Sequence, residues 1–112
     1  METIEIEGRK YKLVPVTDNE TRKIVRTYSA GVFFAAVESR NGKEAVLRNA
    51  RRIWYWAGAA SLSQLATDGT NKPSGCKFPC AVDRIEVTEV IEILDVTSKA
   101  AKSIDEVPVW TA

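Results

Sequence analysis

The dipeptide Asn41-Gly42 constrains the fold of this chain more than any other local feature. A type I′ hairpin turn needs positive φ at both central residues, and Asn followed by Gly adopts that conformation at low cost. The residues on both sides are rich in β-branched and aromatic side chains, which favour strands. We therefore expect one strand to end near Arg40 and the next to begin near Lys43.

Other alternating segments predict an antiparallel sheet around this hairpin. Residues 4–16 are expected to form a short hairpin that turns near Gly8. Residues 23–40 predict two strands, or one bent strand with a bulge at Gly31. Residues 83–96 place Ile85, Val87, Ile91 and Ile93 on one face and Glu86 and Glu92 on the other, and predict a long central strand.

Two short helices are expected in the C-terminal half. Residues 60–67 have leucines at helical spacing, and Gly69 follows as a C-terminal cap. A second helix is expected to begin after a cap at Thr97 or Ser98 and to end before Pro108. With 112 residues the chain fits one domain, residues 1–112. The predicted fold class is α+β: an antiparallel sheet of about five to six strands with two short helices.

The composition excludes several classes of function. The chain has no histidine, which removes His-dependent acid–base and nucleophilic catalysis. Walker, Rossmann and HExxH motifs are missing. Cys76 and Cys80 are too few for a four-ligand zinc site, and we expect free or buried thiols. We predict a protein that is not an enzyme and that uses no metal and no cofactor.

Charge and hydropathy restrict the partners. The net charge is +1, so duplex DNA is not an expected partner and any anion site must be local. No apolar run is long enough to span a bilayer, and the N-terminus lacks the apolar region of a signal peptide. We therefore expect no membrane association and a cytosolic location.

The segment RNARRIWYW, residues 48–56, carries the strongest functional signal. Guanidinium groups fit phosphate oxygens, and aromatic rings stack on bases. In a strand running from Lys43 to about Trp56, alternation places Arg48, Arg52, Trp54 and Trp56 on one face. The opposite face then carries Asn49, Arg51 and Tyr55, so that both faces mix arginine with aromatic groups. These residue types suit a ligand of nucleotide size.

A second group of aromatic residues adds stacking candidates. Phe33 and Phe34 are adjacent, so a strand directs them to opposite faces and only one needs to be in the core. Phe34 is taken with Tyr28 as a second stacking candidate, and we expect Trp110 to pack back on the body. The candidate ligand-binding residues are Arg26, Tyr28, Phe34, Arg48, Asn49, Arg51, Arg52, Trp54 and Trp56.

Two other interpretations of the same residues stay open. The aromatic side chains could be core or subunit-interface anchors, with the arginines covering carboxylates, because Trp, Tyr and Arg are enriched at protein interfaces. The chain would then be a structural or partner-binding protein. Alternatively, the segment could bind single-stranded nucleic acid, with an affinity that falls with salt and grows with oligonucleotide length.

The sequence also resembles a known group of proteins. The stretches RTYSAGVFFAAVESRNGKEAVLRNARRIWYWAGAASLSQLA, CKFP and EVIEIL, followed by a closing helix with KSI, are similar to a widespread family of small tailed-phage proteins. The likeness runs over residues 26–110. Phage proteins of this size and layout resemble the sponge proteins that counter bacterial Thoeris immunity.

The resemblance implies a function that the composition alone does not. It implies a symmetric homo-oligomer, a dimer or a multiple of one, that traps the cyclic ADP-ribose signal of a TIR-domain enzyme without cleaving it. Some members are also expected to hold cyclic oligonucleotides at a separate site. The implied location is the cytoplasm of the infected bacterial host. The assignment of individual site residues comes from their chemistry.

Overall fold

The computed structural model describes residues 3–6, 9–12 and 22–112. In chain order its elements are β1 (Thr3–Ile6), β2 (Arg9–Lys12), β3 (Arg22–Thr27), β4 (Val32–Asn41), β5 (Glu44–Arg52), α1 (Leu62–Asp68), the 3-10 helix η2 (Pro73–Gly75), β6 (Ala81–Val87), β7 (Val90–Asp95) and α2 (Ser98–Asp105). Strands β1 and β2 pair antiparallel, which confirms the first predicted hairpin, although its turn near Gly8 lies outside the described residues. The predicted α+β class is confirmed.

The main sheet has five strands in the order β6-β5-β4-β3-β7, and every neighbouring pair is antiparallel. The prediction of one central strand over residues 83–96 is therefore wrong. That segment is broken at residues 88–89 into β6 and β7, which form the two edges of the sheet, while β4 lies in the centre. Val87 and Val90 are both buried although three residues apart, so the alternation slips at the break.

The two hairpin turns of this sheet form where the sequence places glycine. Gly31 has φ 100° and ends the connection between β3 and β4, so the two-strand interpretation of residues 23–40 is confirmed. Asn41 pairs with Glu44 as the last residue of β4. The predicted position of the second turn is confirmed, but only Gly42, with φ 61°, has positive φ there. Glycine at the first central position also suits a tight hairpin.

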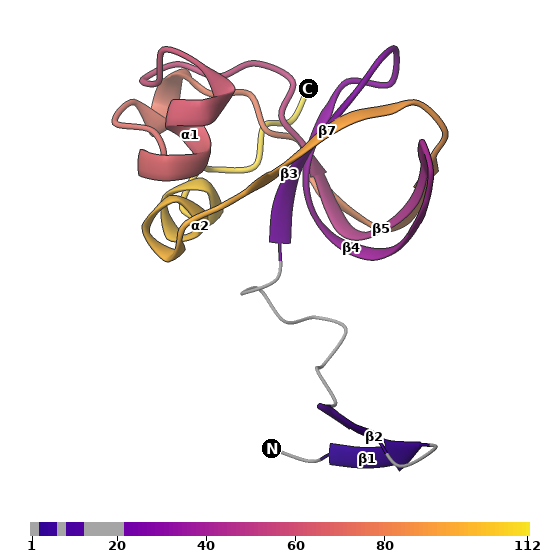
Figure 1. Ribbon diagram of the computed structural model, residues 1–112. Coiled ribbons are helices and arrows are strands. Elements are labelled where there is room, and N and C mark those ends of the chain that lie inside the picture. The colour runs from indigo at the N-terminus through magenta and orange to yellow at the C-terminus, as the bar shows by residue number, and fades with distance from the viewer. Residues whose placement is uncertain (1–2, 7–8, 13–21) are drawn as a thin grey trace.

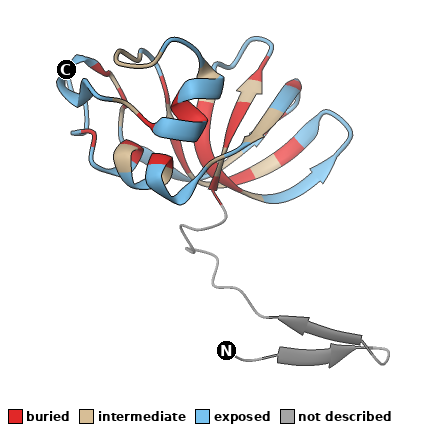
Figure 2. Ribbon diagram, turned by 60° about the vertical axis from the view of Figure 1, so that its left-hand side comes forward, coloured by how far each residue is buried: buried red, intermediate tan, exposed pale blue. Residues whose placement is uncertain are grey.

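Strands β3 and β4 each contribute to two hydrophobic cores, because successive side chains point to opposite faces. Ile24 and Phe34 belong to the helix-side core, together with residues of both helices. Val25 and Phe33 belong to the strand core, which consists only of strand residues. Figure 1 shows the helices together on one side of β3 and the curved strands on the other. In Figure 2 the buried residues follow the strands and the helix faces turned toward them.

A bulge at Asn49 interrupts the alternation of β5. Asn49 has φ 50°, an uncommon value for a residue other than glycine. The register between β4 and β5 shifts at the same level, between Phe34 and Ala36. As a result Leu47 and Ala50, three positions apart, both lie in the strand core. The predicted division of residues 48–56 between two faces is therefore wrong beyond Asn49, because one extra residue reverses the faces.

Both predicted helices are present, although α1 begins at Leu62, two residues later than expected, and α2 ends at Asp105. Ser61 caps α1 by accepting a hydrogen bond from the Gln64 amide, and Gly69 ends it with φ 78°. Thr97 caps α2, and its side chain accepts from the Ala100 amide at 3.0 Å. In the part of the chain that the structure describes, no helix is long and apolar enough to cross a membrane.

Candidate binding site

Arg51 is a structural residue, and the prediction that it binds ligand is wrong. It is buried, and its guanidinium donates four hydrogen bonds to main-chain carbonyl oxygens. The acceptors and donor–acceptor distances are Phe78 (3.1 Å), Pro79 (3.1 Å), Ile104 (3.0 Å) and Val107 (2.7 Å). Burial lowers the pKa of this guanidinium, and the charge of Asp105 opposes that effect. These four bonds fasten the C-terminal segment and the 78–79 loop to β5.

Phe34 is likewise unavailable to a ligand, which corrects its assignment as a stacking residue. Its side chain is 0% exposed in the helix-side core, and the Arg22 guanidinium lies 4.3 Å from the ring centroid. Arg22 also forms a bidentate salt bridge with Asp105, in which Nη1 lies 2.7 Å from Oδ1 and Nη2 lies 2.5 Å from Oδ2. Phe33 is buried as well, so both faces of β4 are covered at this level.

Two further candidate arginines are engaged by carboxylates. Arg48 lies on β5 and pairs with Glu38 at 3.3 Å and with Asp83 at 3.6 Å. Arg26 donates from Nε to Glu92 at 2.9 Å. Both arginines are only partly buried, but a phosphate would have to compete with these carboxylates. Asn49 is half-buried and forms the bulge described above.

Trp56 lies in a different environment from the exposed Trp54. It packs against the helix-side core, half-buried, and its indole Nε1 donates to the Ala59 carbonyl at 3.2 Å. Strand β5 ends at Arg52, so the predicted strand extending to Trp56 is too long. After Arg52 the chain leaves the sheet, and alternation no longer decides which aromatic side chains share a face.

An exposed aromatic platform, defined here as Trp54, Tyr55, Lys77 and Trp110, is the best-formed candidate site among the described residues. Trp54 and Trp110 are stacked, with ring centroids 5.1 Å apart and planes within 5° of parallel. They remain 59% and 42% exposed, and Tyr55 is exposed beside them. The Lys77 ammonium lies 5.3 Å from the Trp54 centroid, 5.5 Å from that of Trp110 and 5.9 Å from that of Tyr55.

Main-chain contacts hold the platform in place. Tyr55 and Lys77 form an antiparallel bridge in which the Lys77 amide donates to the Tyr55 carbonyl at 2.7 Å. The Trp110 amide donates to the Phe78 carbonyl at 3.0 Å. Since Phe78 also supplies one of the carbonyls bound by Arg51, the buried arginine supports the segment that carries Trp110.

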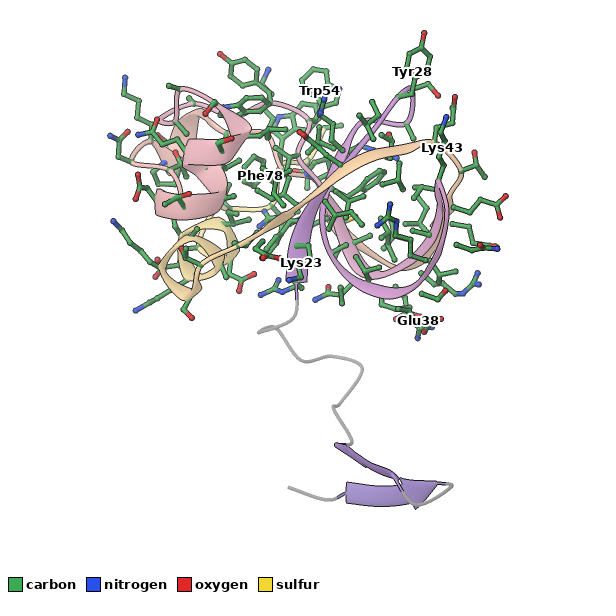
Figure 3. The ribbon with its side chains drawn as sticks, in the orientation of Figure 1. Lys23, Tyr28, Glu38, Lys43, Trp54 and Phe78 are labelled. Carbon is green, nitrogen blue, oxygen red and sulfur yellow. The ribbon has the colours of Figure 1, made fainter. Side chains whose placement is uncertain are left out.

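Arg52 is the last residue of β5 and precedes Trp54 of the platform by two positions. Its guanidinium is 4.6 Å from the Phe33 centroid, and no carboxylate in residues 22–112 pairs with it or with Lys77. A Cβ on Gly31 would lie 3.7 Å from Arg52 Nε, so the β3–β4 turn is adjacent. That turn carries Tyr28, which is 78% exposed. Figure 3 shows Tyr28 and Trp54 at the same end of the molecule.

The structure therefore brings together only part of the predicted site. Arg52 and Trp54 remain, with Tyr28 nearby, whereas sequence reasoning missed Lys77 and gave Trp110 no binding role. The sequence offered one indication that Lys77 lies close to packed side chains, namely its position next to Phe78 in the short apolar stretch CKFP. Both cysteines are free thiols, Cys76 buried and Cys80 exposed, as expected. Residues 22–112 contain no group of three or more possible metal ligands among His, Cys, Asp and Glu.

Comparison with known proteins gives one match. A family model described as a domain of unknown function, DUF6948, matches residues 20–104. The chain belongs to the DUF6948 family. No curated protein and no solved structure matches it. The part matched to DUF6948 contains Arg52, Trp54, Tyr55 and Lys77, and it ends before Trp110.

Proposed function

We propose that this DUF6948 protein binds a small cyclic nucleotide on the aromatic platform and sequesters it without cleaving it. The ligand class is the cyclic ADP-ribose type made by TIR-domain enzymes. The biological setting is anti-defence by a phage in the cytoplasm of its bacterial host. The identity of the ligand follows from the resemblance given above, and the position of the site follows from side-chain chemistry.

The observation that carries the proposal is the stacked, exposed pair Trp54 and Trp110, with the Lys77 ammonium 5.3 and 5.5 Å from their ring centroids. Stacking of one base on an aromatic side chain contributes about 1 to 3 kcal/mol in single-strand binding proteins. Arg52 and Lys77 have no carboxylate partner in residues 22–112. A guanidinium and an ammonium beside a ring surface suit a ligand that joins an adenine to a diphosphate.

The direct test is titration of the purified protein with a cyclic ADP-ribose isomer, followed by calorimetry and tryptophan fluorescence. We expect binding at micromolar concentration and recovery of the intact ligand after heating. Trp54→Ala, Arg52→Gln and Lys77→Gln should each weaken binding by about tenfold, because each removes about 1.4 kcal/mol of contact.

A control variant separates the platform from a general effect of charge. Arg26→Gln removes an exposed arginine that pairs with Glu92. It should bind like the wild type. Absence of micromolar binding would refute the proposal. Stronger binding to longer single-stranded oligonucleotides, with a steep salt dependence, would instead indicate a nucleic-acid binding module.

A further inference from the structure

Strand β6 is an open edge of the sheet. It pairs with β5, and within the described residues no strand pairs with its other side. Residues 81–84 and Glu86 are exposed, and Val82 keeps 49% of its surface accessible. The main-chain N–H and C=O groups along such an edge are a template for pairing with another strand.

The charges on β6 are complementary to a second copy of the same strand. Arg84 and Glu86 lie two residues apart on one face, and their side chains are paired at 3.2 Å. An antiparallel β6–β6 pair with its two-fold axis at Ile85 places Arg84 of each copy opposite Glu86 of the other. In an antiparallel ladder the two-fold axis can pass through a hydrogen-bonded or a non-hydrogen-bonded residue pair. A register in which Ile85 lies opposite its own symmetry mate is therefore geometrically allowed.

The opposite edge of the sheet lacks this complementarity. Strand β7 carries only acidic charges, Glu92 and Asp95, which are engaged by Arg26 and Lys23 of β3. The hydrogen bond from Lys23 and its positive charge lower the pKa of Asp95. No register of β7 against itself aligns opposite charges, so self-association is favoured at β6.

We propose that two copies of this protein associate through β6, antiparallel and centred on Ile85. The two five-stranded sheets then form one continuous sheet. Main-chain hydrogen bonds and the contact of Ile85 with its symmetry mate provide affinity. The two Arg84–Glu86 pairs fix the register, since exposed ion pairs add little energy but like charges placed opposite each other are unfavourable. The interface contains no platform residue, so it stands independently of the proposed ligand.

Charge reversal on β6 tests the interface. Sedimentation equilibrium should show a wild-type dimer that dissociates on dilution. Arg84→Glu places glutamates opposite each other at two points, and Glu86→Arg does the same with arginines. Each should raise the dimer dissociation constant by about tenfold or more. The double variant R84E/E86R should restore dimerisation. Lys102→Glu, an equal charge reversal on exposed α2, should leave it unchanged.

Mixing the two single variants provides a test that does not depend on comparing their stabilities. A mixture of R84E and E86R protein joins Glu to Arg at both contact points, and should form heterodimers although each variant alone is monomeric. A monomeric wild type, or single variants that dimerise as tightly as the wild type, would overturn the proposal. So would failure of the folded variants to form heterodimers.

Discussion

Four carbonyl oxygens around the Arg51 guanidinium connect parts of the chain that are far apart in sequence. Ile104 and Val107 lie more than fifty positions after Arg51, and Phe78 lies 27 positions after it. Guanidinium has five N–H donors and stays charged, so one side chain satisfies several buried acceptors. The Phe78 and Ile104 carbonyls also accept from the Trp110 and Val107 amides, so the guanidinium supplies these two acceptors with an additional donor.

We predict that Arg51→Met lowers the free energy of unfolding by about 3 kcal/mol or more, because four hydrogen bonds from a charged donor to main-chain carbonyls are lost. Urea denaturation measures this change. Arg26→Gln, which breaks an exposed ion pair with Glu92, should cost no more than about 1 kcal/mol. Equal losses in the two variants would contradict the structural role of Arg51.

Residue types alone could not separate the arginines of RNARRIWYW by role. Arg48, Arg51 and Arg52 have the same donors, yet one pairs with carboxylates, one binds carbonyls and one lies over a ring. The partners that decide these roles come from other segments of the chain. The platform was missed for the same reason, because Trp54 and Trp110 meet only after the C-terminal segment has packed.

Among the elements, the contact between α1 and α2 depends on a glycine. Gly69 ends α1 with φ 78°, and a Cβ there would overlap the Cβ and Oγ of Ser103 on α2. The Ser103 hydroxyl also accepts a hydrogen bond from the Thr70 amide at 2.9 Å. The close approach of the two helices therefore requires the absence of a side chain at this position.

A matched pair of glycine substitutions tests that requirement. Gly42→Ala, with φ 61° and no atom within 4 Å of the added Cβ, should cost about 1 to 2 kcal/mol of backbone strain. Gly69→Ala should cost about 3 kcal/mol or more, because strain and overlap with α2 add together. Thermal and urea unfolding of the two variants gives the comparison, and an equal cost would show that α2 moves away freely.

Local sequence patterns predicted most helices, strands and turns. They failed for the features that depend on how strands pair in the sheet, namely the register of β5 and the edge positions of β6 and β7. The Asn-Gly turn, both helix caps and the separation of β3 from β4 are short-range features with a local physical cause. Residues 83–96 alternate except at Glu89 and Val90, and this short local break did not by itself distinguish one long strand from two edge strands. The Asn49 bulge is also invisible locally, since its cause is the fit of β5 against β4.

In the whole molecule, the platform brings Trp54, two residues after the end of β5, against Trp110 of the C-terminal segment, 56 positions later. Stacked aromatic pairs contribute about 0.5 to 1.5 kcal/mol beyond the area that they bury. We predict a coupling energy of about this size between Trp54 and Trp110 in a double-mutant cycle of Trp54→Ala and Trp110→Ala, measured by urea denaturation. The same cycle with Trp56→Ala and Trp110→Ala should show no coupling, because the Trp56 indole is bonded to Ala59. A coupling energy of zero between Trp54 and Trp110 would contradict the stacked arrangement.

The bulge at Asn49 has a consequence for how relatives of this protein can diverge. The extra residue at the bulge determines which face of the sheet each later side chain of β5 occupies. Deletion of one residue there would therefore place Arg51 on the face that Arg52 now occupies, and Arg52 on the face of Arg51. The buried arginine would then lose its carbonyls. Insertions and deletions among DUF6948 members should therefore gather in the turns and be absent between Leu47 and Arg52, making the length of this segment a signature of the fold.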